Sequence, residues 1–136
     1  MIAVDTSVAV AAFATWHDGH QAALAAISGE SDLRLPAHVA LECFSVLTRL
    51  PPPHRARPEL VTAYLRARFP GEPLLLPAPE QRELIDEAAE AGIAGGAVYD
   101  ALVAATARHA GALLLSRDRR AARTYELIGV RYRLVT

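Results

Sequence analysis

Short apolar runs alternate with more polar segments along the whole chain, and this alternation predicts the order of strands and helices. IAVD and ALLLS are continuous apolar runs that end at a polar residue, which is typical of strands buried on both faces of a sheet. The predicted strands are residues 2–5, 33–35, 73–77, 112–116 and 130–135. The predicted helices are residues 6–14, 17–28, 36–50, 58–69, 79–92, 97–111 and 119–129.

Strands that alternate with helices favour an α/β protein in which helices cover both faces of a parallel sheet. We therefore predict a three-layer α/β/α sandwich with a mainly parallel central sheet. The 136 residues suit one domain, residues 1–136, and no internal repeat or linker divides them. The proline-rich segment 51–58 is predicted to be a loop that is too short to separate two domains.

Composition excludes several classes of protein. Hydrophobic residues make up 52% of the chain, which is too many for a disordered protein. No apolar run approaches the roughly 20 residues that span a bilayer, and Asp5 interrupts the first apolar run too early for a signal peptide. The single Cys43 rules out an internal disulfide and a cysteine-based metal site. We expect a cytoplasmic protein with no membrane partner.

Four acidic residues lie within or beside apolar sequence, where an unpaired carboxylate is expensive to bury. Asp5 ends a predicted strand and Asp118 follows another by two residues, and each precedes a helix that it could equally cap. Glu42 lies at the border of an apolar helix face, where a surface pair with His38 or Arg49 is the plainer interpretation.

Asp100 is the acid least easily explained by structure alone. Its helical neighbours at positions 103, 104 and 107 are Val, Ala and Ala, and none of them can neutralise a carboxylate. The C-terminal ends of parallel strands meet at one edge of a sheet, so the four acids can converge there. Converging carboxylates with no Lys or His among them repel one another unless a cation is present. Oxygen-only ligands favour Mg²⁺ or Mn²⁺.

At these positions the sequence resembles the PIN-domain ribonucleases, and in length, order and spacing it is most similar to the VapC-type toxins of bacterial toxin–antitoxin pairs. The resemblance rests on Asp5-Thr6-Ser7 after the first strand, on Glu42 and Asp100, and on Ser116-Arg117-Asp118 after a later strand. It covers essentially the whole chain, as far as the closing GVRYRLV strand.

The resemblance implies a PIN-like domain that acts as a metal-dependent endoribonuclease and hydrolyses RNA phosphodiesters with metal-activated water. The catalytic residues that it implies are Asp5, Glu42, Asp100 and Asp118. Of these, Asp5 and Asp100 with Asp118 would hold Mg²⁺ or Mn²⁺. Ser7 and Ser116 would orient carboxylates or water, or else cap helices.

The resemblance also implies partners, namely an RNA substrate, a cognate antitoxin protein and a second copy of the chain. We expect the homodimer to use apolar positions around Phe13 and Trp16. Arg117, Arg119 and Arg120 bracket the last of the four acids and are candidates for contacts with RNA phosphates, although a solvated basic face is the plainer interpretation.

Two other classes of function remain as alternatives. Another acid-rich, magnesium-dependent phosphohydrolase is disfavoured because the chain has no Lys to support a phosphoryl site. A non-catalytic PIN-like binding module would usually have lost one or more of the four acids, and all four are present. His17 and His20 are spaced for one helix face but lack a third zinc ligand, so we interpret them as surface helix residues.

Overall fold

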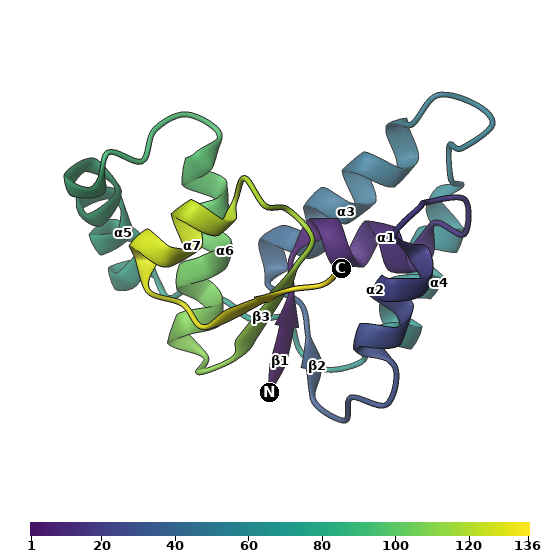
Figure 1. Ribbon diagram of the computed structural model, residues 1–136, viewed down its shortest axis with the longest axis horizontal. Coiled ribbons are helices and arrows are strands. Elements are labelled where there is room, and N and C mark those ends of the chain that lie inside the picture. The colour runs from purple at the N-terminus through teal and green to yellow at the C-terminus, as the bar shows by residue number, and fades with distance from the viewer.

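A four-stranded, entirely parallel sheet forms the centre of the protein in the computed structural model, which describes residues 1–136 (Figure 1). The strands are β1 (Ile2–Val4), β2 (Leu33–Arg34), β3 (Leu113–Ser116) and β4 (Tyr132–Leu134), in the spatial order β2-β1-β3-β4. The expected α/β fold with a mainly parallel sheet is therefore confirmed. Its two central strands, β1 and β3, are far apart in sequence and lie side by side.

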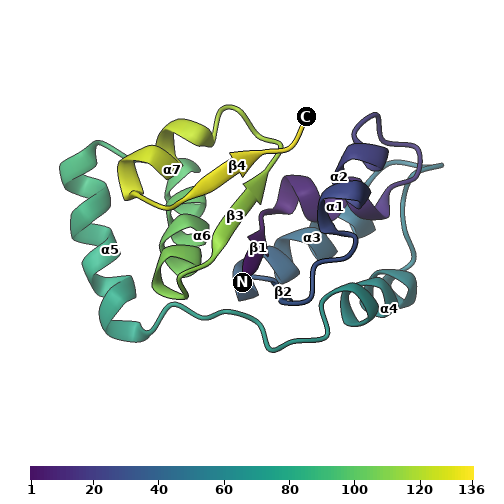
Figure 2. The ribbon, with the colours of Figure 1, turned by 60° about the horizontal axis from the view of Figure 1, so that its bottom comes forward.

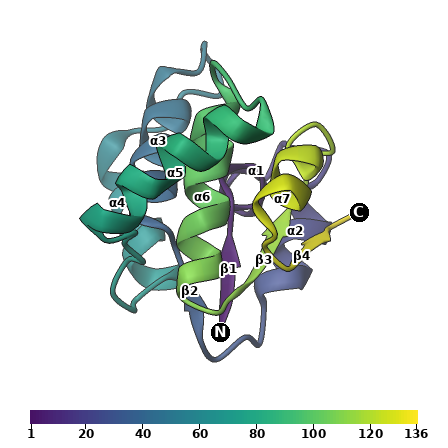
Figure 3. The same cartoon turned by 90° about the vertical axis from the view of Figure 1, so that its left-hand side faces the viewer.

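Seven helices surround the sheet. They are α1 (Thr6–Phe13), α2 (His20–Ile27), α3 (Ala37–Arg49), α4 (Pro58–Arg68), α5 (Ala78–Ala91), α6 (Ala97–His109) and α7 (Ala122–Ile128). In Figures 1 and 3, α5, α6 and α7 lie on one side of the sheet, and α1 and α2 lie on the other. This arrangement gives the three layers that the alternation of strands and helices predicts. None of the helices combines the length and apolar character that crossing a membrane requires.

The register of the two central strands places polar side chains side by side at the C-terminal edge of the sheet. Val4 of β1 pairs with Leu115 of β3, and the backbone N–H of Asp5 donates to the carbonyl of Leu115 at 3.0 Å. Asp5 and Ser116 therefore emerge next to each other at the C-terminal edge of the sheet. A core of 32 buried residues, in which Val4 and Leu115 are completely buried, holds this edge in place.

The predicted strand at residues 73–77 is wrong in its extent. Only Leu74 pairs, through an isolated parallel bridge to Pro36, just beyond β2. Prolines at both ends of the segment have no N–H to donate to a neighbouring strand, so a longer ladder cannot form. The segment runs in an extended conformation between α4 and α5 (Figure 2), and it buries Leu74 and Leu76 while Leu75 remains 70% exposed.

Candidate active site

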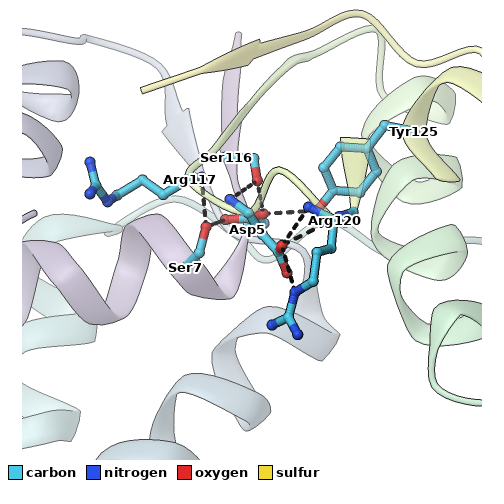
Figure 4. Close-up of polar contacts among 8 residues, drawn as sticks. Asp5, Ser7, Ser116, Arg117, Arg120 and Tyr125 are labelled. Atoms are coloured by element: carbon cyan, nitrogen blue, oxygen red, sulfur yellow. Dashed lines mark hydrogen bonds and ion pairs between the residues drawn. The ribbon is translucent and has the colours of Figure 1, made fainter. Parts of the chain in front are cut away.

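Asp5 is the centre of a buried hydrogen-bond network (Figure 4). Its Oδ1 accepts from the backbone N–H of Val8 at 3.2 Å, which caps α1, and from Ser7 Oγ at 2.5 Å. Its Oδ2 accepts from the hydroxyl of Ser116 and from the Tyr125 hydroxyl, the latter at 2.8 Å. Only 5% of Asp5 is exposed, and burial raises the pKa of its carboxyl although the four donors oppose that rise.

The two serines also connect Asp5 to the loop after β3. Ser7 Oγ accepts from the backbone N–H of Arg117 at 2.7 Å, and Ser116 Oγ accepts from that of Asp118 at 3.0 Å. Each hydroxyl thus donates to the carboxylate and accepts from the loop backbone. The loop that carries Asp118 is therefore held against the end of β1, and the orienting role expected of Ser7 and Ser116 stays a prediction.

Tyr125 is a member of this network that the sequence does not reveal. It lies on α7, is 1% exposed, and reaches back across the chain to Asp5. In the sequence Tyr125 occupies an ordinary buried position of an amphipathic helix, and nothing in its local pattern distinguishes it from a core residue. Contact with a carboxylate 120 positions earlier exists only after the chain has folded.

The four acids predicted from the sequence line one cavity of about 210 Å³, which we call the acidic cavity. Asp5 and Asp118 come from the loops after β1 and β3, Glu42 from α3, and Asp100 from the first turn of α6. Ser7 and Tyr125 also line this cavity. Four separate segments of the chain therefore place a carboxylate around the same space, as the strand-end argument predicts.

Asp100 has no hydrogen-bond donor of the kind that surrounds Asp5. Burial and, to a smaller extent, the nearby charges of Asp118, Asp5 and Glu42 together raise the pKa of its carboxyl to about 6, against the weaker opposing effect of Arg120. Like charges held in one cavity without a cation are expected to do this. The electrostatics of Asp100 therefore favour the binding of either a proton or a metal ion.

Glu42 and Asp118 have other partners within the chain. Glu42 Oε2 lies 3.1 Å from Nε2 of His38, which is the surface pair anticipated as its plainer interpretation. Asp118 Oδ1 accepts from the backbone N–H of Arg120 at 2.9 Å and from that of Ala121 at 3.4 Å, so it also caps the turn before α7. Both acids line the acidic cavity as well, so these contacts do not exclude a functional role.

The donor set fits Mg²⁺ or Mn²⁺, because every charged group in the acidic cavity is a carboxylate. In the present side-chain arrangement no three acidic or histidine side chains are close enough together to hold one metal ion. The partners of the acids account for this. Asp5 already accepts four hydrogen bonds, which is about the number of its lone-pair sites, and Glu42 is turned toward His38.

The predicted basic residues divide into two groups. Arg117 and Arg120 line a second cavity beside the acidic one, whereas Arg119 is exposed and lines neither cavity. His17 also lines that second cavity. The interpretation of His17 as a surface helix residue is wrong, because it lies in the turn before α2 and is half-buried.

The aromatic residues proposed for a dimer interface are used within the chain. The Phe13 ring packs edge-on against Tyr64 of α4, with ring centroids 5.1 Å apart. The Trp16 ring stacks on His54 at 4.1 Å, so the aromatic side chain covers the proline-rich loop. Trp16 is nevertheless 45% exposed.

A model of the PIN domain matches residues 2–127, which is nearly the entire chain. The parallel sheet, with acids gathered at its C-terminal edge, agrees with that match. The chain belongs to the PIN-domain family, within its VapC ribonuclease branch.

Among its relatives, ribonuclease VapC40 of Mycobacterium tuberculosis is 54% identical over 136 residues, which are 100% of both chains. Ribonuclease VapC27 of the same species is 44% identical over 129 residues, which cover 95% of this chain and 93% of that protein. The alignment with VapC40 spans the whole chain and therefore includes the segments that carry all four acids.

Two solved structures share the fold at low sequence identity. FitAcB from Neisseria gonorrhoeae superposes with a TM-score of 0.72 at 19% identity, covering 97% of this chain and 96% of that one. VapBC2 from Rickettsia felis, solved bound to a DNA fragment from their promoter, superposes with a TM-score of 0.68 at 18% identity, and 98% of each chain is covered.

Proposed function

We propose that this chain is the toxin of a toxin–antitoxin pair, and that it is an endoribonuclease that hydrolyses RNA phosphodiester bonds with Mg²⁺ or Mn²⁺ as its cofactor. The observation that carries the proposal is the acidic cavity, in which four segments of the chain present carboxylates to one space. The full-length relatives named as ribonucleases support it. The single core of 32 residues supports the accompanying proposal that residues 1–136 act as one domain.

The proposed catalytic residues are Asp5, Glu42, Asp100 and Asp118, and the proposed metal ligands among them are Asp5, Asp100 and Asp118. A bound divalent cation would supply activation of water and stabilisation of charge on the phosphate. The same cation would neutralise the mutual repulsion that raises the pKa of the Asp100 carboxyl.

The residues of the chain would contribute orientation and proton control. Ser7, Ser116 and Tyr125 fix the Asp5 carboxylate at the end of β1. The side chains of Glu42 and Asp118 are 42% and 35% exposed, so their present contacts are partly solvated and exchange for a ligand at modest cost. The buried network is therefore the rigid part of the site, and the other acids complete it.

Metal dependence gives a direct test. The purified chain is expected to cleave single-stranded RNA in Mn²⁺ or Mg²⁺, to stop in excess chelator, and to recover when the metal is returned. Addition of a cognate antitoxin is expected to suppress the same cleavage. Cleavage that persists in chelator would contradict the metal proposal, and a chain that never cleaves RNA would instead favour a non-catalytic PIN-like module.

We also propose a homodimer, for which Phe13 offers less surface than the sequence suggests because its ring packs against Tyr64 of α4. Larger exposed apolar side chains are Leu41 of α3, Ile85 of α5 and Tyr99 of α6, which are 73%, 68% and 58% exposed, and the last two line one cavity. The His38 ring of α3 stacks on Tyr99 of α6 at 5.3 Å, so we propose that these helices form the dimer contact together. Light scattering at micromolar concentration is expected to give the mass of two chains, and Tyr99→Glu is expected to shift it to one.

A further inference from the structure

A second cavity, of about 400 Å³, adjoins the acidic cavity and carries the opposite charge. The two share Thr6, Ser7 and Asp118 as lining residues, so one opens beside the other. Arg117 and Arg120 supply its positive charge. We call this space the basic cavity.

Arg117 is held in place by its packing rather than by an acid. Its Nη1 donates to the carbonyl of Val135 at 3.1 Å, and four of its five guanidinium N–H groups have no partner within the chain. The guanidinium also lies against Gly19, where an added Cβ would come within 2.3 Å of Arg117 Cζ. In Figure 4 the Arg117 side chain extends away from Asp5, so it does not neutralise the acidic cavity.

His17 also lines the basic cavity, and one of its ring nitrogens already has a partner within the chain. The backbone N–H of Gly19 donates to Nδ1 of His17 at 2.9 Å, which occupies the acceptor nitrogen of the ring. The neutral ring must therefore carry its proton on Nε2. The backbone of the turn is itself tied down, because His17 N–H donates to the Ala14 carbonyl at 2.9 Å.

Arg120 lines the basic cavity next to Asp118, which lines both cavities. Its Nε is 3.7 Å from Asp118 Oδ1, and its side chain is 96% exposed, so this ion pair is weak and the guanidinium is available to a ligand. The cavity thus offers two guanidinium groups and one imidazole N–H against a single carboxylate. That set of donors suits a phosphate group.

We propose that the basic cavity is a subsite for an RNA phosphate that flanks the phosphate being cleaved, and that Arg117, Arg120 and His17 bind it. The inference rests on the proposed ribonuclease function. Adjacent cavities of opposite charge would accept one RNA strand in a single register, with the scissile phosphate over the carboxylates and its neighbour on the arginines. The subsite would determine where along the strand the acidic cavity acts.

The test measures binding of a short, labelled, single-stranded RNA of random sequence to the full chain in chelator and low salt, by fluorescence anisotropy. Arg117→Ala is expected to weaken binding by about tenfold, the change that accompanies loss of one charged hydrogen bond. It should also lower the slope of log affinity against log salt by about 0.7, the value for one phosphate contact on a single strand. Arg123→Ala, which removes the same charge from an exposed position on α7, is the matched control and should change neither quantity.

A second variant tests the geometry without removing the charge. Gly19→Ala should push the guanidinium of Arg117 from its position and reproduce part of the loss of affinity, because the obstructed atoms belong to a flexible side chain and the fold can adjust. If wild type cleaves RNA but Arg117→Ala binds RNA as Arg123→Ala does, the subsite is wrong and the nuclease proposal survives. If wild type neither binds nor cleaves RNA, the proposed function fails and the subsite fails with it.

Discussion

Replacement of Asp100 with Asn is expected to reduce metal-dependent RNA cleavage by more than about 100-fold. Loss of a residue that only orients a metal ligand costs up to about 100-fold, and loss of a ligand itself should cost more. Asp100 faces the acidic cavity and has no structural hydrogen bond that Asn would break. The lower activity would therefore come from the loss of a negatively charged metal ligand. Initial rates measured across a Mn²⁺ titration would check it.

The same variant is expected to be more stable than wild type in the absence of metal at neutral pH. The raised pKa of Asp100, about 6 against an ordinary 3.8, lets the folded chain retain a proton that the unfolded chain releases. Stability of metal-free wild type therefore falls as pH rises from about 4 to about 6. Asn at position 100 cannot titrate, so the stability of the variant should fall less over this pH range. A smaller fall should remain because the pKa of the buried Asp5 carboxyl is also raised.

Chemical denaturation at several pH values, alongside the cleavage assay, separates the two effects. Asp86→Asn is the matched control, because Asp86 is an exposed acid on α5. It should leave both cleavage and the pH dependence of stability unchanged. An Asp100→Asn variant that cleaves RNA at the wild-type rate would remove Asp100 from the proposed ligands.

Replacement of Tyr125 with Phe is expected to lower cleavage by about 10- to 100-fold and to raise the Mn²⁺ concentration needed for half-maximal rate. The Tyr125 hydroxyl donates to Asp5 at 2.8 Å and favours the ionised carboxylate. Without it, burial raises the pKa of Asp5 further, and protons compete better with metal. The fold should lose only about 1 kcal/mol, because three other donors to Asp5 remain.

Tyr132→Phe supplies the comparison for this variant. The Tyr132 hydroxyl donates to Glu126 at 2.7 Å on the surface, and its ring packs edge-on against that of Tyr125. Tyr132→Phe thus removes the same hydroxyl oxygen from a neighbouring ring that does not line the acidic cavity. Equal metal requirements for the two variants would mean that Tyr125 serves only to pack α7 against the sheet.

The sequence by itself determined the order of strands and helices and which four acidic residues are candidates for the site. Continuous apolar runs predicted β1 and β3 correctly, because strands covered on both faces show no polar alternation. The rule that parallel strands end at one edge then placed Asp5 and Asp118 together before any contact was known. Asp100 could be identified from local sequence, because no residue on its own helix face can pair with its carboxylate.

Only the tertiary structure decided which partner each side chain has. Asp5 is both a helix cap and the acceptor for Tyr125, and no local pattern predicts a contact across 120 positions. Segment 73–77 has strand-like composition, but its flanking prolines limit pairing to Leu74. Arg117 contacts Gly19 instead of an acid because α2 packs beside the loop that follows β3. Local periodicity reports which face of an element is buried, whereas side-chain partners are selected by the free energy of contacts between elements, and those contacts exist only in the assembled fold.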